Sequence, residues 1–348
     1  MSSHVKNNLL RMLAALAAVI LIIAVLPSCR REINPEDDKL FVKLVSDEER
    51  RALTEDNYLV GFYDRDGARH GYSFTQGTGE DAVSCPAGTY DIMVYSLGSQ
   101  STRIQDEGSW ETAKAATTEV KVEIRNNFKT AKTILATYVA AMGVSPATTK
   151  AGFENDAVVV QPDPMWSFAR RDNDIPLRAR EDAGGYSVTV PVDDVTRDGH
   201  ISIRIDGGAE WVRGGYAYLS NLARYRYLAD GRACKEAASV YIPLNREGNS
   251  DVLEASFRCF GIMEDHYENT IYLVISDVMG TQHLFAFNVT SQVRASGDGD
   301  IDIDLSEKEI IISEPADFGN QDAFRPYIKN WSEEFVDVPI GQGKNKKK

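Results

Sequence analysis

The sequence predicts an all-β protein built from antiparallel β-sandwiches. Short apolar or alternating segments recur along the chain, in the second half at intervals of roughly 10–15 residues, which is typical of sandwich or barrel strands. Gly, Asn or Asp stands between most of these segments, where turns are expected. The chain also lacks the regular alternation of strands and helices that predicts a parallel sheet.

Before these segments, residues 1–28 predict a lipoprotein signal peptide. Lys6 and Arg11 precede an apolar run, residues 13–26, that is shorter than the roughly 20 residues a spanning helix needs. The run ends in "LPSC", which looks like a bacterial lipobox, although Pro27 fits that pattern imperfectly. Such signals are cut before the cysteine, so we expect Cys29 to carry the lipid and residues 29–38 to form a tether. An ordinary secretory signal and a single membrane anchor are the alternatives.

The mature chain is acidic. The full sequence has a net charge of −14, which becomes −16 without the two basic residues of the signal. This charge disfavours nucleic acid and a bilayer surface as electrostatic partners. The remaining cysteines, Cys85, Cys234 and Cys259, are too few and odd in number for a disulfide scaffold. Buried free thiols are the favoured interpretation, and a Cys234–Cys259 bridge in an oxidising compartment is the alternative. No cofactor is expected.

Residues 39–150 predict an N-terminal sandwich. The segment "NYLVGFYD", the turn Arg65-Asp66-Gly67 and the segment "GYSF" predict a hairpin. Residues 40–45 and 89–96 predict further strands. Residues 117–125, "TTEVKVEIR", alternate as a half-buried strand does.

A helix and a boundary follow. Residues 129–142 are alanine-rich and are followed by Gly143 and, shortly after, Pro146, which predicts a helix and its end. The segment "VSPATTKAG" resembles a linker, so we place a domain boundary near Lys150.

Residues 151–314 predict a second sandwich. Arg197-Asp198-Gly199 predicts a turn between "YSVTVPV" and "HISIRID". Five more strands are predicted in the order "YAYLSNL", "SVYIPL", "EASFRCFGI", "NTIYLVISD" and "HLFAFNV". Residues 315–348 form an extension in which residues 334–340 predict a late strand after Trp331.

Several of these segments together resemble the fimbrillin-like lipoproteins of Gram-negative bacteria, a superfamily that includes fimbrial anchor subunits and members of unknown function. The matching pieces are "LPSC", "CPAGTYDIMVYS", "RDGHISIRIDGG", "EASFRCFGIMEDHYENTIYLVISD", "HLFAFNVTSQV" and "NWSEEFVDVPI". The resemblance implies two transthyretin-like β-sandwich domains in tandem and non-covalent assembly through strand exchange. It implies no catalytic residues.

The chain lacks the common enzyme motifs for a nucleophilic serine, a zinc protease site or a phosphate-binding loop. Its five histidines are scattered, and the one at the proposed Arg197–Gly199 turn, His200, is expected to be exposed. We therefore predict that the protein is not an enzyme.

One acidic run imitates a calcium-binding loop. Asp298, Asp300, Asp302 and Glu309 have EF-hand spacing, but Ile303 stands where such a loop needs Gly. The isoleucines between the aspartates fit a strand with one wet, acidic face, so an edge strand is favoured over a metal site.

Tyrosines and arginines suggest a second binding surface. Four tyrosines and three arginines lie close together in the sequence: Tyr216, Tyr218, Tyr225, Tyr227, Arg213, Arg224 and Arg226. Such a set is either a platform on which a glycan stacks or, as is favoured, aromatic packing within a sandwich.

Two functional hypotheses follow. The first is an outer-membrane lipoprotein that acts as a fimbrial anchor or accessory subunit and pairs strands with fimbrial subunits. The second is a surface lipoprotein that binds a glycan or a host ligand. For the first, the candidate partner strand lies in the C-terminal extension, with Trp331, Phe335, Val336, Val338 and Ile340 as its apolar residues. A last strand that completes its own domain is the alternative.

Overall fold

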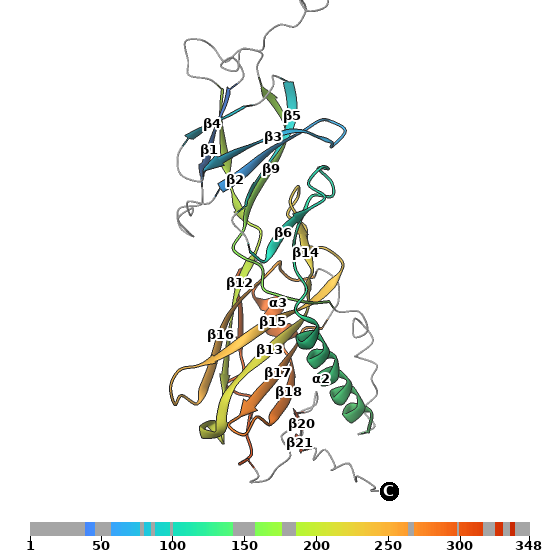
Figure 1. Cartoon of the computed structure of the whole chain (residues 1–348), viewed down its shortest axis with the longest axis vertical. Coiled ribbons are helices and arrows are strands. Elements are labelled where there is room, and N and C mark those ends of the chain that lie inside the picture. Colours follow the sequence, from blue (N-terminus) through green and yellow to red (C-terminus); the bar gives the residue numbers. More distant parts are fainter. Residues whose placement is uncertain are drawn as a thin grey trace, which may run out of the picture.

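The structure of the protein is a computed structural model. It describes residues 39–45, 57–76, 80–84, 88–97, 100–141, 157–175, 186–263, 268–297, 299–315, 324–329 and 335–337. Most of these residues lie in β-strands, as the predicted all-β class requires (Figure 1). The strands form a five-stranded sheet, a ten-stranded sheet and two small sheets of three strands each.

The five-stranded sheet holds the predicted first hairpin. Its order is β11 (Asp193–Asp194), β9 (Trp166–Ile175), β5 (Gly88–Ser96), β2 (Asn57–Tyr63) and β3 (Arg69–Gln76). The turn between β2 and β3 closes where the Gly67 amide donates to the Asp64 carbonyl at 2.8 Å. Gly67 has φ 78°, a left-handed conformation that glycine adopts without strain.

Both faces of this sheet are buried, which explains why β2 and β5 are apolar almost without alternation. On one face, Phe62 and Ile92 pack with Val190 of β10 (Tyr186–Pro191), which forms a small sheet with β1 (Lys39–Val45) and β4 (Glu80–Ser84). On the other face, Met93 and Tyr95 pack beneath Trp110 and the second small sheet. That sheet has the order β14 (Tyr225–Tyr227), β7 (Lys114–Thr117) and β6 (Thr102–Gln105).

The ten-stranded sheet encloses the largest core. Its main path is β19 (Ile301–Asp304), β12 (Arg197–Arg204), β16 (Val252–Cys259), β15 (Ala237–Arg246), β13 (Val212–Ala223), β17 (Thr270–Asp277), β18 (Gln282–Asn288), β20 (Phe324–Lys329) and β21 (Phe335–Asp337). β8 (Ala157–Val159) pairs with β15 off this path. Only two residue pairs join β15 to β16, so the sheet folds over there into two layers. Side chains from both layers, including Ile203 and Leu273, share one core cluster.

Helices cover parts of this sheet. α2 (Val122–Ala141) lies along its outer face, against the layer of β13, β17 and β18 (Figure 1). α3 (Thr290–Ala295) and the short 3-10 helix η3 (Ala209–Trp211) lie in connections between strands.

The chain passes between the sheets more than once. α2 and β8 pack on the ten-stranded sheet, although they precede β9, β10 and β11, which belong with the N-terminal strands. Strands from both sides of residue 150 therefore share sheets, and the expected boundary does not coincide with a change of sheet. The division into two transthyretin-like domains stays a prediction.

Two local predictions are wrong. Residues 122–125 belong to α2 and not to a strand. Val120, Val122 and Ile124 fit a period of two, but Ile124, Phe128 and Ala131 fit the helical period, and these three face the sheet while Val122 is exposed.

The second wrong prediction is the turn at Arg197-Asp198-Gly199, which lies within β12 and pairs with β16. Gly199 lies opposite Phe257, and a Cβ atom at Gly199 would come within 2.3 Å of the Phe257 ring. The glycine thus allows a close approach between strands, which the sequence alone does not distinguish from a turn.

Candidate functional site

The tyrosine–arginine set is divided by the fold. Tyr216 and Tyr218 lie on β13, where their rings are 5.4 Å apart and each is 5.6 Å from the ring of Tyr241 on β15. Tyr218 is 1% exposed, and its hydroxyl donates to the Ile124 carbonyl of α2 at 3.1 Å. Burial raises the pKa of the Tyr218 hydroxyl, which keeps it neutral. This half of the set is core packing beneath α2.

The other two tyrosines lie on β14, in the small sheet. The rings of Tyr225 and Tyr227 meet edge to face at 5.5 Å, and both residues are half-buried. Lys114 lies 4.7 Å from the centre of the Tyr225 ring, and Arg232 lies 4.8 Å from that of Tyr227. Each ring is therefore half-buried with a cation beside it, which leaves less ring surface open than at an exposed tyrosine.

The arginines of the set are structural. Arg224 pairs with Glu119 at 3.1 Å and with Glu236 at 3.6 Å. Arg226 donates to the Gly231 carbonyl and, at 3.1 Å, to the Val195 carbonyl in the connection between β11 and β12. Arg213 is exposed on β13. Arg224 and Arg226 therefore fix connections between segments.

The acidic run forms β19, at the border of the ten-stranded sheet. Ile301 and Ile303 are buried, while Asp302 and Asp304 are exposed, as expected of an edge strand with one wet face. Within the described part of the chain, no group of three or more His, Cys, Asp or Glu is placed to hold a metal ion. Asp298 lies outside that part, so the calcium site stays a prediction.

The cysteines lie apart in the core. Cys234 and Cys259 are both buried free thiols, in separate core clusters. The Cys234 thiol donates to the Glu236 carbonyl and accepts from the Tyr225 amide, and burial raises the pKa of the Cys259 thiol to about 11. Cys85 lies outside the described residues.

The late strand is found in part. Residues Phe335–Asp337 form β21, which pairs antiparallel with β20 of the same chain. β20 in turn pairs with β18 in parallel, and that pairing spans only Gln282–Leu284. Trp331, Val338 and Ile340 lie outside the described residues.

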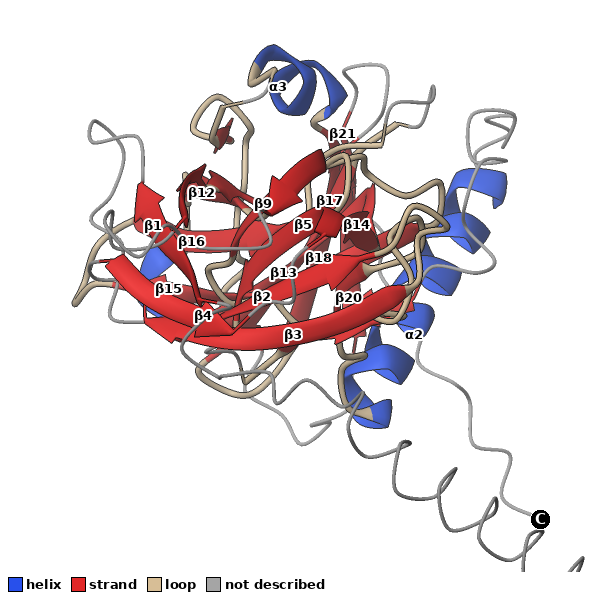
Figure 2. Cartoon of the chain, turned by 90° about the horizontal axis from the view of Figure 1, so that it is seen from above, coloured by secondary structure: helices blue, strands red, loops and turns tan. Residues whose placement is uncertain are grey.

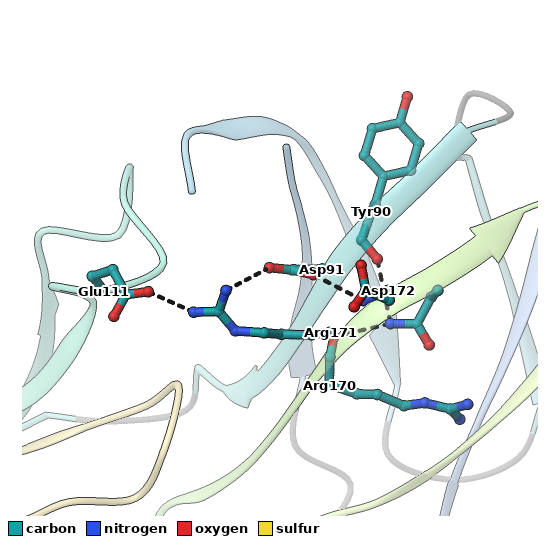
Figure 3. Close-up of polar contacts among 7 residues, drawn as sticks. Tyr90, Asp91, Glu111, Arg170, Arg171 and Asp172 are labelled. Atoms are coloured by element: carbon teal, nitrogen blue, oxygen red, sulfur yellow. Dashed lines mark hydrogen bonds and ion pairs between the residues drawn. The ribbon is translucent and has the colours of Figure 1, made fainter. Parts of the chain in front are cut away.

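A set of polar contacts that the sequence analysis did not identify fixes the long β6–β7 connection to the five-stranded sheet (Figure 3). Arg171 on β9 reaches Glu111 in that connection and lies 3.8 Å from Asp91 on β5. Its guanidinium also lies 5.4 Å from the centre of the Trp110 ring. Asp91 is buried and accepts a hydrogen bond from the Asp172 amide at 2.9 Å, at a β-bulge that no periodic pattern in the sequence marks.

A second unpredicted feature is a pair of exposed rings on β3. Tyr72 and Phe74 are 55% and 59% exposed, and their ring centres lie 5.5 Å apart, edge to face. Arg69, on the same strand, lies 5.1 Å from the centre of the Tyr72 ring and forms an ion pair with Glu107 at 3.2 Å. We call Arg69, Tyr72, Phe74 and Glu107 the edge aromatic site.

The membrane anchor falls outside the structure. Cys29 and the rest of residues 1–38 are not among the described residues, so lipid attachment stays a prediction. Within the described part, no helix has the length and apolar character needed to cross a membrane.

Two solved structures share this fold. A candidate adhesin from Bacteroides ovatus matches with TM-score 0.57 at 16% identity, over 82% of this chain and 96% of its own. A second candidate adhesin from Bacteroides ovatus has TM-score 0.50 at 9% identity, covering 88% of this chain and 93% of its own. The fimbrial anchor protein Mfa2 from Porphyromonas gingivalis aligns with TM-score 0.45 at 13% identity, over 76% of this chain and 88% of its own. No curated protein matches the sequence.

A family model matches more than half of the chain. It spans residues 42–242 and so runs from β1 through the five-stranded sheet into β15 of the ten-stranded sheet. Together with the shared fold, this match confirms the predicted resemblance to fimbrillin-like proteins of unknown function. The chain belongs to the family defined by the domain of unknown function (DUF5119).

Proposed function

We propose that this chain is a cell-envelope lipoprotein that serves as a fimbrial anchor or accessory subunit and assembles with partner subunits by β-strand pairing. The observation that carries the proposal is the partly covered edge of β18. β18 has seven residues, Gln282–Asn288, and β20 pairs only with Gln282–Leu284. Among the described strands, the register of β20 ends at Leu284, and no other strand continues along the outer edge at Ala286–Asn288.

Such an edge can accept a strand. The unpaired N–H and C=O groups of an edge form a ladder with an added strand, and each hydrogen bond contributes about 0.5–1.5 kcal/mol net. Pro326 pairs opposite Leu284 and has no amide to donate, so the present β18–β20 ladder is short and weak. The C-terminal extension is therefore the segment most readily exchanged for one from a neighbour, with Phe335 and Val336 of β21 in the exchanged strand.

The predicted lipid at Cys29 supports the proposed anchor role, because it would attach the N-terminus of the chain to a membrane. A lipoprotein cysteine at position 29 carries more than one acyl chain, and two chains anchor a protein stably where one does not. The N-terminus would then be fixed to the outer membrane while the C-terminal extension meets other subunits. The fold shared with the two candidate adhesins supports a surface role.

Deletion of residues 331–348 tests the proposal, with deletion of residues 341–348 as the matched control. We expect the longer deletion to leave the melting temperature close to that of the intact protein and to abolish co-purification of fimbrial subunits from the same cells. The control should keep both. If the longer deletion unfolds the protein, the last strand belongs to its own core and the proposal fails.

A further inference from the structure

The two rings of the edge aromatic site, Tyr72 and Phe74, are exposed and belong to none of the core clusters of the described fold. In the register of β2 and β3, Phe74 lies opposite Leu59 and Tyr72 lies opposite Gly61. On this face of the sheet Leu59 is buried beneath the second small sheet and the β6–β7 connection, while both rings on β3 stay exposed. The cover of this face therefore ends before the rings of Tyr72 and Phe74. Their strand, β3, lies at the border of the five-stranded sheet (Figure 2).

The polar side of the site is held in place. The Tyr95 hydroxyl donates to Glu107 Oε2 at 2.9 Å, and Arg69 Nη2 donates to Glu107 Oε1 at 3.3 Å. The Tyr63 hydroxyl donates to the backbone carbonyl of Glu107 at 2.8 Å. A carboxylate has about four acceptor positions, and the side chain of Glu107 is 45% exposed. Acceptor capacity therefore remains for donors from a ligand.

The backbone adds further polar groups. β3 is the last strand of the five-stranded sheet, and among the described strands none pairs with its outer edge in this sheet. An edge strand presents N–H and C=O groups that an incoming hydroxyl can meet. The Arg69 amide at the start of β3 donates to the Gly108 carbonyl at 2.9 Å, so the backbone groups that a ligand would meet are those beside the two rings, at Tyr72 and Phe74.

We propose that the edge aromatic site binds neutral carbohydrate, with the apolar face of a sugar on Tyr72 and Phe74 and its hydroxyls on Glu107 and the β3 backbone. A sugar ring has an apolar C–H face and a rim of hydroxyls, and this site offers apolar faces beside polar groups. The charges of Arg69 and Glu107 cancel each other, so the site favours a neutral ligand over a charged one.

A protein partner fits the site less well. A stable protein interface buries about 800 Å² on each partner around a desolvated centre. Here the apolar surface is two rings beside an ion pair. The other exposed large hydrophobic residues of the described part lie elsewhere: Leu97 is separated from β3 by β2, and Val122, Val278, Met279 and Ile311 belong to segments at the ten-stranded sheet.

The test is affinity electrophoresis of the detergent-extracted full chain against four neutral polysaccharides, mannan, xylan, dextran and laminarin, followed by calorimetric titration with any that retard it. Tyr72→Ala and Phe74→Ala should each weaken binding about tenfold, the cost of losing a stacking aromatic side chain. Phe74→Tyr should retain binding, because it keeps the ring. Met279→Ala is the matched control, since Met279 is 53% exposed in the turn after β17 and should bind as the parent does.

Melting temperatures and size-exclusion profiles complete the test. The two alanine variants should keep the parent melting temperature, because both rings are exposed. Failure of all four polysaccharides to bind overturns the proposal, and so does binding that survives both alanine substitutions. A change in oligomeric state on losing the rings, without a change in polysaccharide binding, would instead identify the site as a protein interface.

Discussion

The rings of Phe128 and Tyr218 lie 4.4 Å apart, and this contact joins α2 to β13. Phe128 also meets Tyr272 of β17 at 5.4 Å and is 1% exposed. We predict that Phe128→Ala lowers the free energy of unfolding by about 3–5 kcal/mol, because it leaves a cavity between helix and sheet. Urea unfolding measures the change.

Val122 provides the control for this prediction. It begins the same helix but is 55% exposed, so Val122→Ala should change the free energy of unfolding by no more than about 0.5 kcal/mol. Equal effects of the two substitutions would mean that α2 does not depend on Phe128 for its attachment.

Gly199→Ala should destabilise the protein. The added methyl group would meet the ring of Phe257 inside contact distance, and overpacking of this kind costs about 1–3 kcal/mol. Gly214→Ala, on β13, adds a methyl group into open space and should cost less. The urea unfolding midpoints of the two variants measure these changes. A smaller loss of stability in Gly199→Ala than in Gly214→Ala would contradict the close packing of β12 on β16.

Alkaline pH should weaken the fold through Tyr63. Burial raises the pKa of the Tyr63 hydroxyl from 10 to about 12. Above pH 10 the unfolded chain loses this proton before the folded chain does, so stability falls as the pH rises from 10 towards 12. Tyr63→Phe removes this contribution, and we expect its urea midpoint to fall less steeply over that range.

The same variant should be less stable at neutral pH, because it loses the 2.8 Å hydrogen bond to the Glu107 carbonyl, at a cost of about 1 kcal/mol. Tyr72→Phe changes an exposed ring and is the control for the slope. An alkaline slope that is unchanged in Tyr63→Phe would show that other groups produce it.

Cys29→Ala tests the anchor. We expect the variant to lose labelling by a fatty-acid probe and to leave the detergent phase, or to stay uncleaved, because no residue remains for lipid attachment. Cys85→Ala keeps the proposed lipid site and serves as the control. A Cys29→Ala protein of cleaved size that still carries the label would rule out the lipobox interpretation.

Strands could be predicted well from the sequence where one face of the strand is buried and the other is exposed, because apolar and polar residues then alternate. Alternation at "HISIRID" and at "GDIDIDL" marks β12 and β19, whose apolar side chains face one core. The prediction from alternation failed at the start of α2, where the apolar residues fit both the two-residue period of a strand and the 3.6-residue period of a helix. Packing of Phe128 against two tyrosines far away in the sequence selects the helix there, and no local pattern contains that information.

Candidate binding residues were harder to predict than strands, because exposure depends on distant segments. Tyr218 and Tyr72 are both tyrosines in alternating strands, but α2 covers the first and nothing in the described fold covers the second as closely. The β6–β7 connection and its Trp110 cover part of this face of the sheet, so their position determines how much of β3 stays exposed. That position depends on Arg171, Glu111 and Asp91, which come from three separate segments.

The route of the chain between its sheets has a mechanical consequence. The backbone crosses from the N-terminal sheets to the ten-stranded sheet between β7 and α2, returns between β8 and β9, and crosses again between β11 and β12. It then leaves the ten-stranded sheet once more, from β13 to β14, which pairs with β7, and comes back at β15. A pulling force between a membrane-bound N-terminus and a partner at the C-terminal extension would load a junction spanned by five backbone segments. Arg226 of β14 donates to the Val195 carbonyl in one of these segments. A proteolytic cut in the α2–β8 segment would sever none of these crossings, so such a junction should withstand both tension and nicking better than a single linker.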